Sequence, residues 1–446
     1  MSDSRSLWDA WQSLLSSYRS VFTGPGWVRF VQWVTGLVLC DEDHFLTRAV
    51  RAIGLKSQWR ALERFAEYGS WNRNAVEQET IRLIERECDV QWNGYRPVAL
   101  DDTKAYRSSK KVWGVCTFRE YTARSPNRAT TVRAHNWVVL GDLIPGKPWW
   151  YLPHSSRLYF RKSQLPQGET FRTKLQLGTE MLQQEARTST TRVLGVFDGA
   201  FANRVVVPNC LRPENGEDPR IEILTKLRTD ACLHAPLAVT ATKKRGRPRK
   251  WGQRLAAPKD HDQWDAPWED GEAFLYGRTR RFRAKRLECR WRVSGPDEPV
   301  SVLALEVDGY SKPWYLVTSA TNLTTSQIAQ AYAARFRQED GFRDHKQLMG
   351  MKECRAWTKE PILRTFQVQM VAMTLLRLIQ FQLDALGRWW EEMPWYPQKR
   401  HASILDLRRL FWKHQDDFSQ FVLQPHETRE NRERHTEPRP QATRAA

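Results

Sequence analysis

The chain has 446 residues, enough for roughly two to four domains with a proper hydrophobic core. Its 70 Lys and Arg residues outnumber 51 Asp and Glu residues, and the formal charge of +19 favours a polyanionic partner such as DNA or RNA. The seven cysteines and ten histidines are scattered without metal-ligand spacing, which argues against a zinc enzyme and against a disulfide-rich secreted domain.

Residues 1–95 are predicted to be mainly helical. Apolar residues recur at helical spacing in SLWDAWQSLLSSY, FLTRAVRAIGL and SQWRALERFAEY. Within this block, basic residues gather between residues 48 and 64, namely Arg48, Arg51, Lys56, Arg60 and Arg64. The block is a candidate reader of DNA ends, of the helix-turn-helix type, or alternatively a basic helical bundle that packs on the rest of the chain.

Residues 96–234 change to short apolar runs that predict the strands of an α/β layered core. The runs are VALDDT, HNWVVLGDL, PWWYLP, VLGVFDG and IEILTKL, with the helical segment GTEMLQQEARTSTTR between them. Two runs end in acidic residues, the first in Asp101 and Asp102 and the second in Asp198. Taken singly, an Asp at the end of a strand is as well explained as a turn residue.

Residues 235–312 predict a β-rich insertion that follows a basic linker. GEAFLYGRTRRFRAKRLECRWRV and VSVLALEV have the pattern of antiparallel strands with alternating basic residues. In the linker KKRGRPRK, Arg245, Arg247 and Arg249 surround Gly and Pro, the arrangement that AT-hook peptides lay into the narrow minor groove of A·T-rich DNA. The alternative is a solvated basic linker that contacts phosphates without sequence preference.

Residues 313–390 predict the second part of the core, with one helix over residues 324–346. Tyr332, Arg335, Glu339 and Lys346 follow one another at spacings of three, four and seven residues. Such spacing places them along one face of a helix, although a solvated amphipathic helix with ordinary charge pairs has a similar pattern.

The segment 362–386 is apolar over a length that could span a bilayer, yet charged and Gln residues interrupt it. It is therefore predicted as a buried helix that packs on the catalytic sheet. Residues 391–446 predict a further helical segment and, from residue 424, a polar, Pro-containing tail of the disordered kind.

The run QAYAARFRQEDGFRDHKQ resembles one group of DDE-type transposases of bacterial insertion sequences, whose pattern is Tyr, two residues, Arg, three residues, Glu, six residues, Lys. This resemblance implies a ribonuclease-H-like mixed sheet flanked by helices and an Asp, Asp, Glu triad. Asp101, Asp198 and Glu339 occur in the implied order. Asp101 is preferred to Asp102 because it fits the family's Asp-x-Thr pattern, and neighbouring strand residues point to opposite faces.

The triad implies metal-dependent cleavage of a phosphodiester. Two Mg²⁺ ions, or Mn²⁺ as a substitute, prefer oxygen ligands and support an in-line displacement by water or by a DNA 3′-hydroxyl. Arg335, Lys346 and Tyr332 would then contact DNA phosphate. One resemblance thus assigns Asp101, Asp198 and Glu339 to metal binding and Tyr332, Arg335 and Lys346 to DNA binding.

The resemblance implies a transposase that binds the ends of its insertion sequence, cleaves them and joins the 3′ ends to target DNA. The alternatives are a related nuclease without strand transfer and a domesticated DNA-binding protein, the latter disfavoured because the three carboxylates are all present. The expected partners are double-stranded DNA and a second copy of the chain in a homodimer, with no membrane. The expected location is the bacterial cytoplasm, at the nucleoid.

Overall fold

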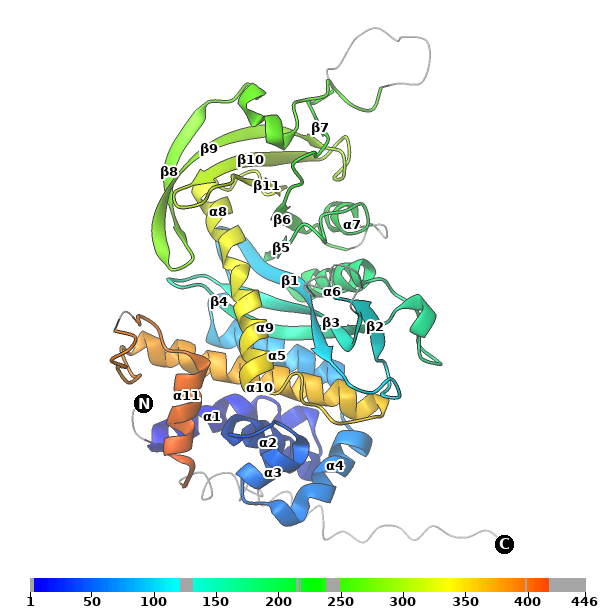
Figure 1. Ribbon diagram of the computed structural model, residues 1–446, viewed down its shortest axis with the longest axis vertical. Helices are drawn as coiled ribbons and strands as arrows, with labels where there is room; N and C mark the ends of the chain where they lie inside the picture. Colours follow the sequence, from blue (N-terminus) through cyan, green and yellow to red (C-terminus); the bar gives the residue numbers. More distant parts are fainter. Residues whose placement is uncertain are drawn as a thin grey trace. The chain divides into compact units, whose positions relative to one another are not determined.

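The computed structural model describes residues 4–120, 131–213, 216, 218–237, 249–397 and 399–416. The chain divides into two units, Met1–Leu83 with Gln347–Ala446, and Ile84–Lys346. Figure 1 follows the elements of both units along the chain.

The first unit is helical, as predicted for the N-terminal block. Its helices are α1 (Ser4–Ser16), α2 (Gly24–Leu39), α3 (Leu46–Ala52), α4 (Trp59–Tyr68), α10 (Lys359–Ala385) and α11 (Ile404–Lys413), with the short 3-10 helices η1 (Arg19–Val21) and η2 (Lys56–Gln58). Helix α5 (Arg73–Glu87) crosses from this unit into the next. Thr23 caps α2 by accepting a hydrogen bond from the backbone N–H of Gly26, which satisfies one of the donors left over at a helix start.

Helix α10 packs against α1, α2, α4 and α11 and so belongs to the first unit. Among the described residues it is the helix long and apolar enough to cross a membrane, but 89% of its apolar stretch is buried inside the protein. The predicted burial is confirmed, whereas the prediction that this segment is part of the catalytic core was wrong. A helix that is apolar all round has no polar face in its sequence from which its neighbours can be inferred.

The second unit is built on an 11-stranded mixed sheet. The strands are β1 (Tyr95–Tyr106), β2 (Cys116–Arg119), β3 (Thr131–Ile144), β4 (Trp150–Tyr159), β5 (Arg192–Phe197), β6 (Glu222–Lys226), β7 (Leu233–His234), β8 (Trp268–Leu275), β9 (Arg278–Trp291), β10 (Pro299–Val307) and β11 (Trp314–Thr318). Their order is β2-β3-β1-β5-β6-β11-β10-β9-β7, with β4 also paired to β3 and β8 to β9. Strand β5 runs parallel to both β1 and β6, and the other pairs are antiparallel.

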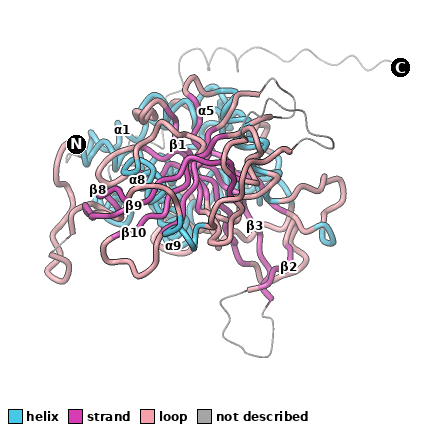
Figure 2. The backbone as a smooth tube through the Cα atoms, turned by 90° about the horizontal axis from the view of Figure 1, so that it is seen from above, coloured by secondary structure: helices cyan, strands magenta, loops and turns pink. Residues whose placement is uncertain are grey.

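Helices lie against this sheet. They are α6 (Lys174–Thr188), α7 (Val206–Leu211), α8 (Thr325–Ala334) and α9 (Phe336–Leu348), with the 3-10 helices η3 (Lys162–Gln164) and η4 (Pro258–Gln263). Helix α6 contacts β1, β3, β4 and β5, and α8 contacts β5, β6 and β8. Figure 2 shows α8 and α9 beside the strands. The predicted ribonuclease-H-like arrangement, a mixed sheet flanked by helices, is confirmed.

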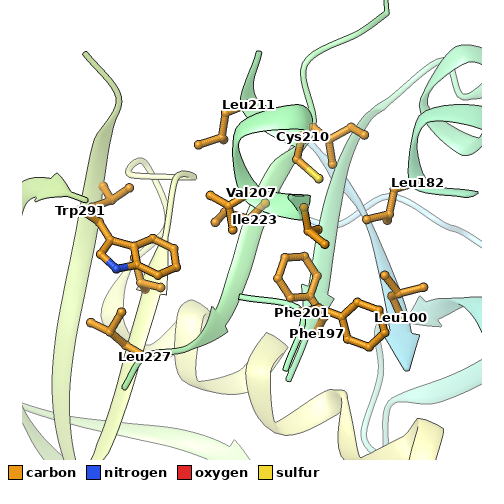
Figure 3. Close-up of a cluster of buried hydrophobic side chains, with 14 of the residues drawn as sticks. Leu100, Leu182, Phe197, Phe201, Val207, Cys210, Leu211, Ile223, Leu227 and Trp291 are labelled. Carbon is orange, nitrogen blue, oxygen red and sulfur yellow. The ribbon is translucent and has the colours of Figure 1, made fainter. Parts of the chain in front are cut away.

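Apolar side chains fill the layer between α6, α7 and the sheet. Phe197 and Phe201 lie next to Leu100 in this layer, and their ring centroids are 6.4 Å apart (Figure 3). Gly178 allows α6 to approach β1, because a Cβ there would lie 2.8 Å from a methyl carbon of Leu100. This core packs against β1, which contains Asp101, and against β5, which ends just before Asp198.

The predicted β-rich insertion is present as β8, β9 and β10, which extend the central sheet. Strand β10 pairs with β9 on one side and with β11 on the other. Along β9, Phe282 and Ala284 are buried while Arg281 and Arg283 are exposed, which is the alternation of a strand with one covered face. The pairing of β10 with β11, the next strand along the chain, joins the insertion to the core.

Candidate active site

The first two candidate aspartates come directly after the last parallel pair of β1 and β5. Asp198 follows the end of β5, whereas Asp101, which the sequence placed at the end of a strand, lies within β1, which continues to Tyr106 in its pairing with β3. Strands β1 and β5 pair in register up to Leu100 opposite Phe197, and Asp101 and Asp198 are the next residues. Neighbouring strands lie about 4.8 Å apart, so the two carboxylates leave the sheet close together. Burial, and then the negative charge of Asp198, raise the pKa of Asp101 to about 7.

Asp101 and Asp102 have different surroundings. Oδ2 of Asp101 lies 3.6 Å from Nη1 of Arg335, and its Oδ1 accepts a hydrogen bond from the backbone N–H of Asp102. Oδ1 of Asp102 instead accepts a hydrogen bond of 2.8 Å from Nζ of Lys174 on α6. Successive strand residues point to opposite faces, and Asp101 is therefore the one that shares a face with Arg335.

The predicted single helix over residues 324–346 is two helices, α8 and α9, that meet at Arg335. Arg335 keeps right-handed helical angles, with φ −51° and ψ −32°. Its N–H donates to the carbonyl of Tyr332 at 3.2 Å, and its own carbonyl accepts from the N–H of Gln338 at 2.9 Å. These are the tighter hydrogen bonds of a 3-10 turn, for which the sequence carries no distinct signal.

Arg335 connects two of the three carboxylates. Its Nη2 donates a hydrogen bond of 2.7 Å to Oε1 of Glu339, while its Nη1 faces Asp101. The side chain of Arg335 is 13% exposed and that of Glu339 is 43% exposed. Burial alone would lower the pKa of Arg335, but Tyr332 and the two acids outweigh it and raise that pKa.

Tyr332 lies beside the same group. Its ring centroid is 5.8 Å from Cζ of Arg335. Burial raises the pKa of Tyr332, and the charges of Asp198 and Glu339 act in the same direction, which places the phenol near both acids. Lys346, partly buried on α9, lies seven residues after Glu339 and therefore on the same side of the helix about two turns away.

Residues 27–295, more than half of the chain, match the family of DDE superfamily endonucleases. The chain belongs to this family. No curated protein matches it. The matched part of this DDE superfamily endonuclease contains Asp101 and Asp198 and ends before Glu339, so that the third carboxylate is assigned from its resemblance motif and from its position.

The donor set of the endonuclease site suits a hard divalent cation. Asp101 lies near Asp198, and Arg335 connects Asp101 with Glu339; the repulsion between Asp198 and Asp101 that contributes to the raised pKa would be relieved by a bound cation. Divalent cations are typical of DDE nucleases, and carboxylate oxygens are the ligands that Mg²⁺ and Mn²⁺ prefer. The chemistry of these carboxylates therefore suits a divalent cation.

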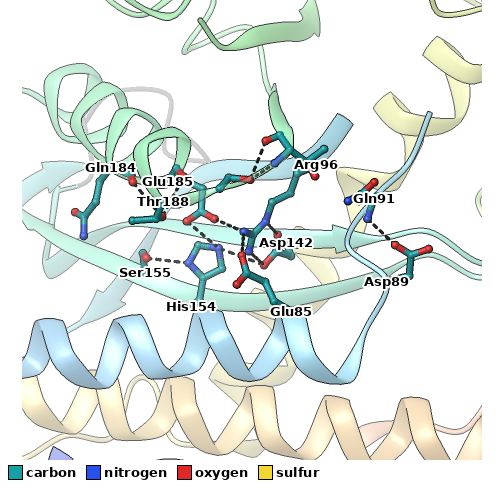
Figure 4. Close-up of polar contacts among 12 residues, drawn as sticks. Glu85, Asp89, Gln91, Arg96, Asp142, His154, Ser155, Gln184, Glu185 and Thr188 are labelled. Carbon is teal, nitrogen blue, oxygen red and sulfur yellow. Dashed lines mark hydrogen bonds and ion pairs between the residues drawn. The ribbon is translucent and has the colours of Figure 1, made fainter. Parts of the chain in front are cut away.

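A second group of potential metal ligands is buried in the endonuclease, formed by Asp142, His154 and Glu185 (Figure 4). Arg96 Nε and Nη2 donate to both oxygens of Asp142 at 2.7 and 2.9 Å, and Nη1 lies 3.0 Å from Glu185. His154 Nε2 lies 3.7 Å from Asp142 and 3.9 Å from Glu185. Because the guanidinium already pairs with both carboxylates, ion pairing accounts for this group without a cation.

Gln338 is a site residue that the sequence analysis missed. Its side chain is fully buried, and Nε2 lies within hydrogen-bond distance of the carbonyls of Ala99 and Val139 and of the hydroxyl of Tyr151. Gln338, Gly341, Phe342 and His345 are the buried residues of α9. Gly341, Phe342 and His345 follow Gln338 by three, four and seven residues, and this spacing in the sequence indicates one buried helix face. No sequence motif marks a Gln on such a face as part of a site.

Exposed aromatic side chains border the site as well. Tyr276, Tyr310 and Phe336 are each about 40% exposed, and the ring of Tyr276 lies 6.2 and 5.6 Å from the other two. Tyr276 has a positive φ of 50°, which is costly for a residue with a side chain. Burial and nearby phenols raise the pKa of Tyr276 to about 12, and the charge of Glu339 adds to this shift.

Two of the three linker arginines, Arg245 and Arg247, lie outside the described residues, as does the predicted tail from residue 424. Arg249, the third, is exposed.

Proposed function

We propose that this endonuclease is a transposase that binds the ends of its own insertion sequence, cleaves them by metal-dependent hydrolysis and joins the 3′ ends to target DNA. One observation carries the proposal. Arg335 contacts both Asp101 and Glu339 beside Asp198, although these acids are separated by 97 (198 − 101) and 141 (339 − 198) positions. In an ordinary solvated helix, an Arg that pairs with a Glu of the same segment need not also approach an acid of the neighbouring sheet.

In this proposal Asp101, Asp198 and Glu339 hold the metal, expected to be two Mg²⁺ ions with Mn²⁺ as a substitute. When bound, such ions supply an activated water and stabilise the leaving oxygen. Asp102 is not assigned to this set because it pairs with Lys174. The attacking group is water during cleavage and a DNA 3′-hydroxyl during joining, and no protein nucleophile is needed.

Arg335 is the proposed partner of a DNA phosphate. Its Nε is buried and has no hydrogen-bond partner among the described residues, while Nη2 is bonded to Glu339. A phosphate oxygen can accept from the N–H groups of the guanidinium that Glu339 does not use, and Arg suits phosphate through its planar fork. Tyr332, beside Arg335, and Lys346, along the same face of α9, are the further proposed phosphate contacts. The exposed rings of Tyr276, Tyr310 and Phe336 offer surfaces for DNA bases.

Recognition of the transposon ends is proposed for the N-terminal helices. Arg48 and Arg51 are both paired with Glu42, so Arg60 and Arg64 on α4 are the better candidates for DNA contacts. Arg245, Arg247 and Arg249 of the basic linker are proposed to enter a narrow minor groove. Two copies of the chain, one for each DNA end, are expected in the complex, and the proposed location is the bacterial cytoplasm at the nucleoid.

The test uses the purified full-length protein and the DNA that flanks its gene. With Mg²⁺ and a target plasmid, we expect cuts at the element ends and joined products whose sequences show short target duplications. Asp198→Asn serves as the inactive control. Cutting without joining would support a nuclease without strand transfer, and binding without cutting in the wild type would support a domesticated DNA-binding protein.

A further inference from the structure

We infer that Gln338 is a positioning residue that holds α9 against β1 and thereby sets the approach of Glu339 to Asp101. The inference rests on the proposed function in one respect, namely that these two carboxylates share bound metal.

The amide of Gln338 attaches α9 to the sheet at Asp101. Nε2 lies 3.2 Å from the carbonyl of Ala99, two residues before Asp101 on β1, and 3.1 Å from the carbonyl of Val139. Val139 is the residue of β3 that pairs with Asp101. One side chain of α9 therefore bonds to both strands beside the first carboxylate, and Glu339 is the very next residue of the helix.

Packing holds the same turn of α9. Tyr151, whose hydroxyl lies 3.1 Å from Nε2 of Gln338, also packs its ring 6.4 Å from that of Phe342. Gly341 permits this contact, because a Cβ there would lie 2.7 Å from Cδ1 of Tyr151. The helix face made by Gln338, Gly341 and Phe342 therefore fits β1, β3 and β4 in one position.

Stability alone does not explain an amide at this place. Oε1 of Gln338 is buried and has no hydrogen-bond partner among the described residues, which is costly in free energy. An apolar residue of similar length, such as Met, would avoid that cost. Met has no N–H groups, whereas the two N–H groups of the amide can bond to both carbonyls and so fix the axial position and the rotation of α9 relative to them.

Glu339 needs such an anchor because its own side chain is not held by burial. It is 43% exposed, and its hydrogen bond is to Arg335, at the junction of α8 and α9. Arg335 approaches β1 at Asp101, but at 3.6 Å this contact is longer than the hydrogen bond of 3.2 Å from Gln338 to Ala99. Metal ligands supported by other residues lose roughly 10-fold to 100-fold in metal affinity when that support is removed. Loss of the Gln338 amide should therefore weaken metal binding before it abolishes folding.

The experiment compares Gln338→Met with wild type by Mn²⁺ binding in the absence of DNA, followed by electron paramagnetic resonance, and by cleavage at increasing Mg²⁺. We expect about tenfold weaker Mn²⁺ binding, a matching increase in the Mg²⁺ needed for half-maximal cleavage, and recovery of most cleavage at saturating metal. Gln330→Met on α8 is the control: Gln330 is partly buried rather than fully buried, has no hydrogen bond to β1 among the described residues, and its replacement should behave like wild type. Asp198→Asn with Glu339→Gln identifies the signal that comes from the site.

Wild-type metal affinity in Gln338→Met would overturn the inference. If that variant does not fold, Gln338→Asn, which keeps the amide on a side chain too short to reach both carbonyls, should show the same loss of metal affinity, and unchanged affinity there would overturn the inference equally. A wild-type protein that binds Mn²⁺ but never cuts DNA would refute the proposed function and leave the metal comparison valid.

Discussion

Nη2 of Arg335 donates a hydrogen bond of 2.7 Å to Oε1 of Glu339, four residues further along the chain. Because the same guanidinium also faces Asp101, it lies between an acid of α9 and an acid of β1. We expect this side chain to bind DNA phosphate as its third anionic partner. Arg335, and Lys346 on the following helix, are therefore expected to matter more for cleavage than for general DNA affinity.

Arg335→Ala and Lys346→Ala should each lower cleavage strongly while DNA affinity falls only modestly. Other basic residues supply most of the general attraction, and each lost phosphate contact should reduce the salt dependence of binding by roughly one unit of slope. Arg343→Ala is the control, since Arg343 pairs with Asp340 on α9 and is 58% exposed. Cleavage and salt-dependent binding are measured on the same DNA end. A wild-type cleavage rate in Lys346→Ala would show that this part of the motif is coincidental.

Asp101→Asn, Asp198→Asn and Glu339→Gln should each reduce cleavage in Mg²⁺ by roughly 100-fold or more while DNA binding is largely kept, because the lost charge binds metal rather than phosphate.

Asp102→Asn tests the choice between the adjacent acids. It removes a partner of Lys174, not of Arg335, and should retain most cleavage. Nuclease assays and binding assays with the same DNA decide the matter, and parallel loss of binding and cutting would point instead to a folding role.

In the absence of metal, Asp101→Asn should make the protein more stable at pH 8. The folded-state pKa of about 7 lies above the ordinary value of 3.8, so the folded state holds its proton more tightly and stability falls as pH rises from about 4 to about 7. At 1.36 kcal/mol for each pKa unit, the penalty above pH 7 is at most about 4 kcal/mol. Asn cannot ionise, so the Asp101→Asn variant does not have this free-energy penalty. Urea unfolding in EDTA at pH 5 and pH 8 should show the larger gain at pH 8, and an equal effect at both values would refute the electrostatic explanation.

Asp142→Asn should destabilise the second unit by roughly 3–5 kcal/mol, because it leaves the buried guanidinium of Arg96 without its main partner. Glu180→Gln is a suitable control. Glu180 pairs with Arg172 at the surface, where both side chains are about half exposed, and its loss should cost roughly 0–1 kcal/mol. The free energy of unfolding in urea gives both numbers. A small effect of Asp142→Asn would mean that the network contributes little to folding.

The sequence by itself determined the kinds of element. Helical spacing in residues 1–95 and apolar runs in residues 96–234 depend on neighbours along the chain, and the strand before Asp198 was correctly predicted from them, whereas β1 continues past Asp101 to Tyr106 because it pairs with β3. The spacing of Tyr332, Arg335, Glu339 and Lys346 is likewise local. These features could be inferred because each is set within one helix or one strand.

Tertiary contacts alone decided the rest. Whether Asp101 or Asp102 faces Arg335 depends on the pairing of β1 with β3 and β5, and the 3-10 turn at Arg335 depends on how α8 and α9 each fit the sheet. The place of α10 among the N-terminal helices depends on the partners of an all-round apolar surface. Gln338 shows the limit best. Its amide bonds to two backbone carbonyls that are more than 190 residues away in the chain. The sequence around Gln338 does not indicate which distant backbone groups it will contact.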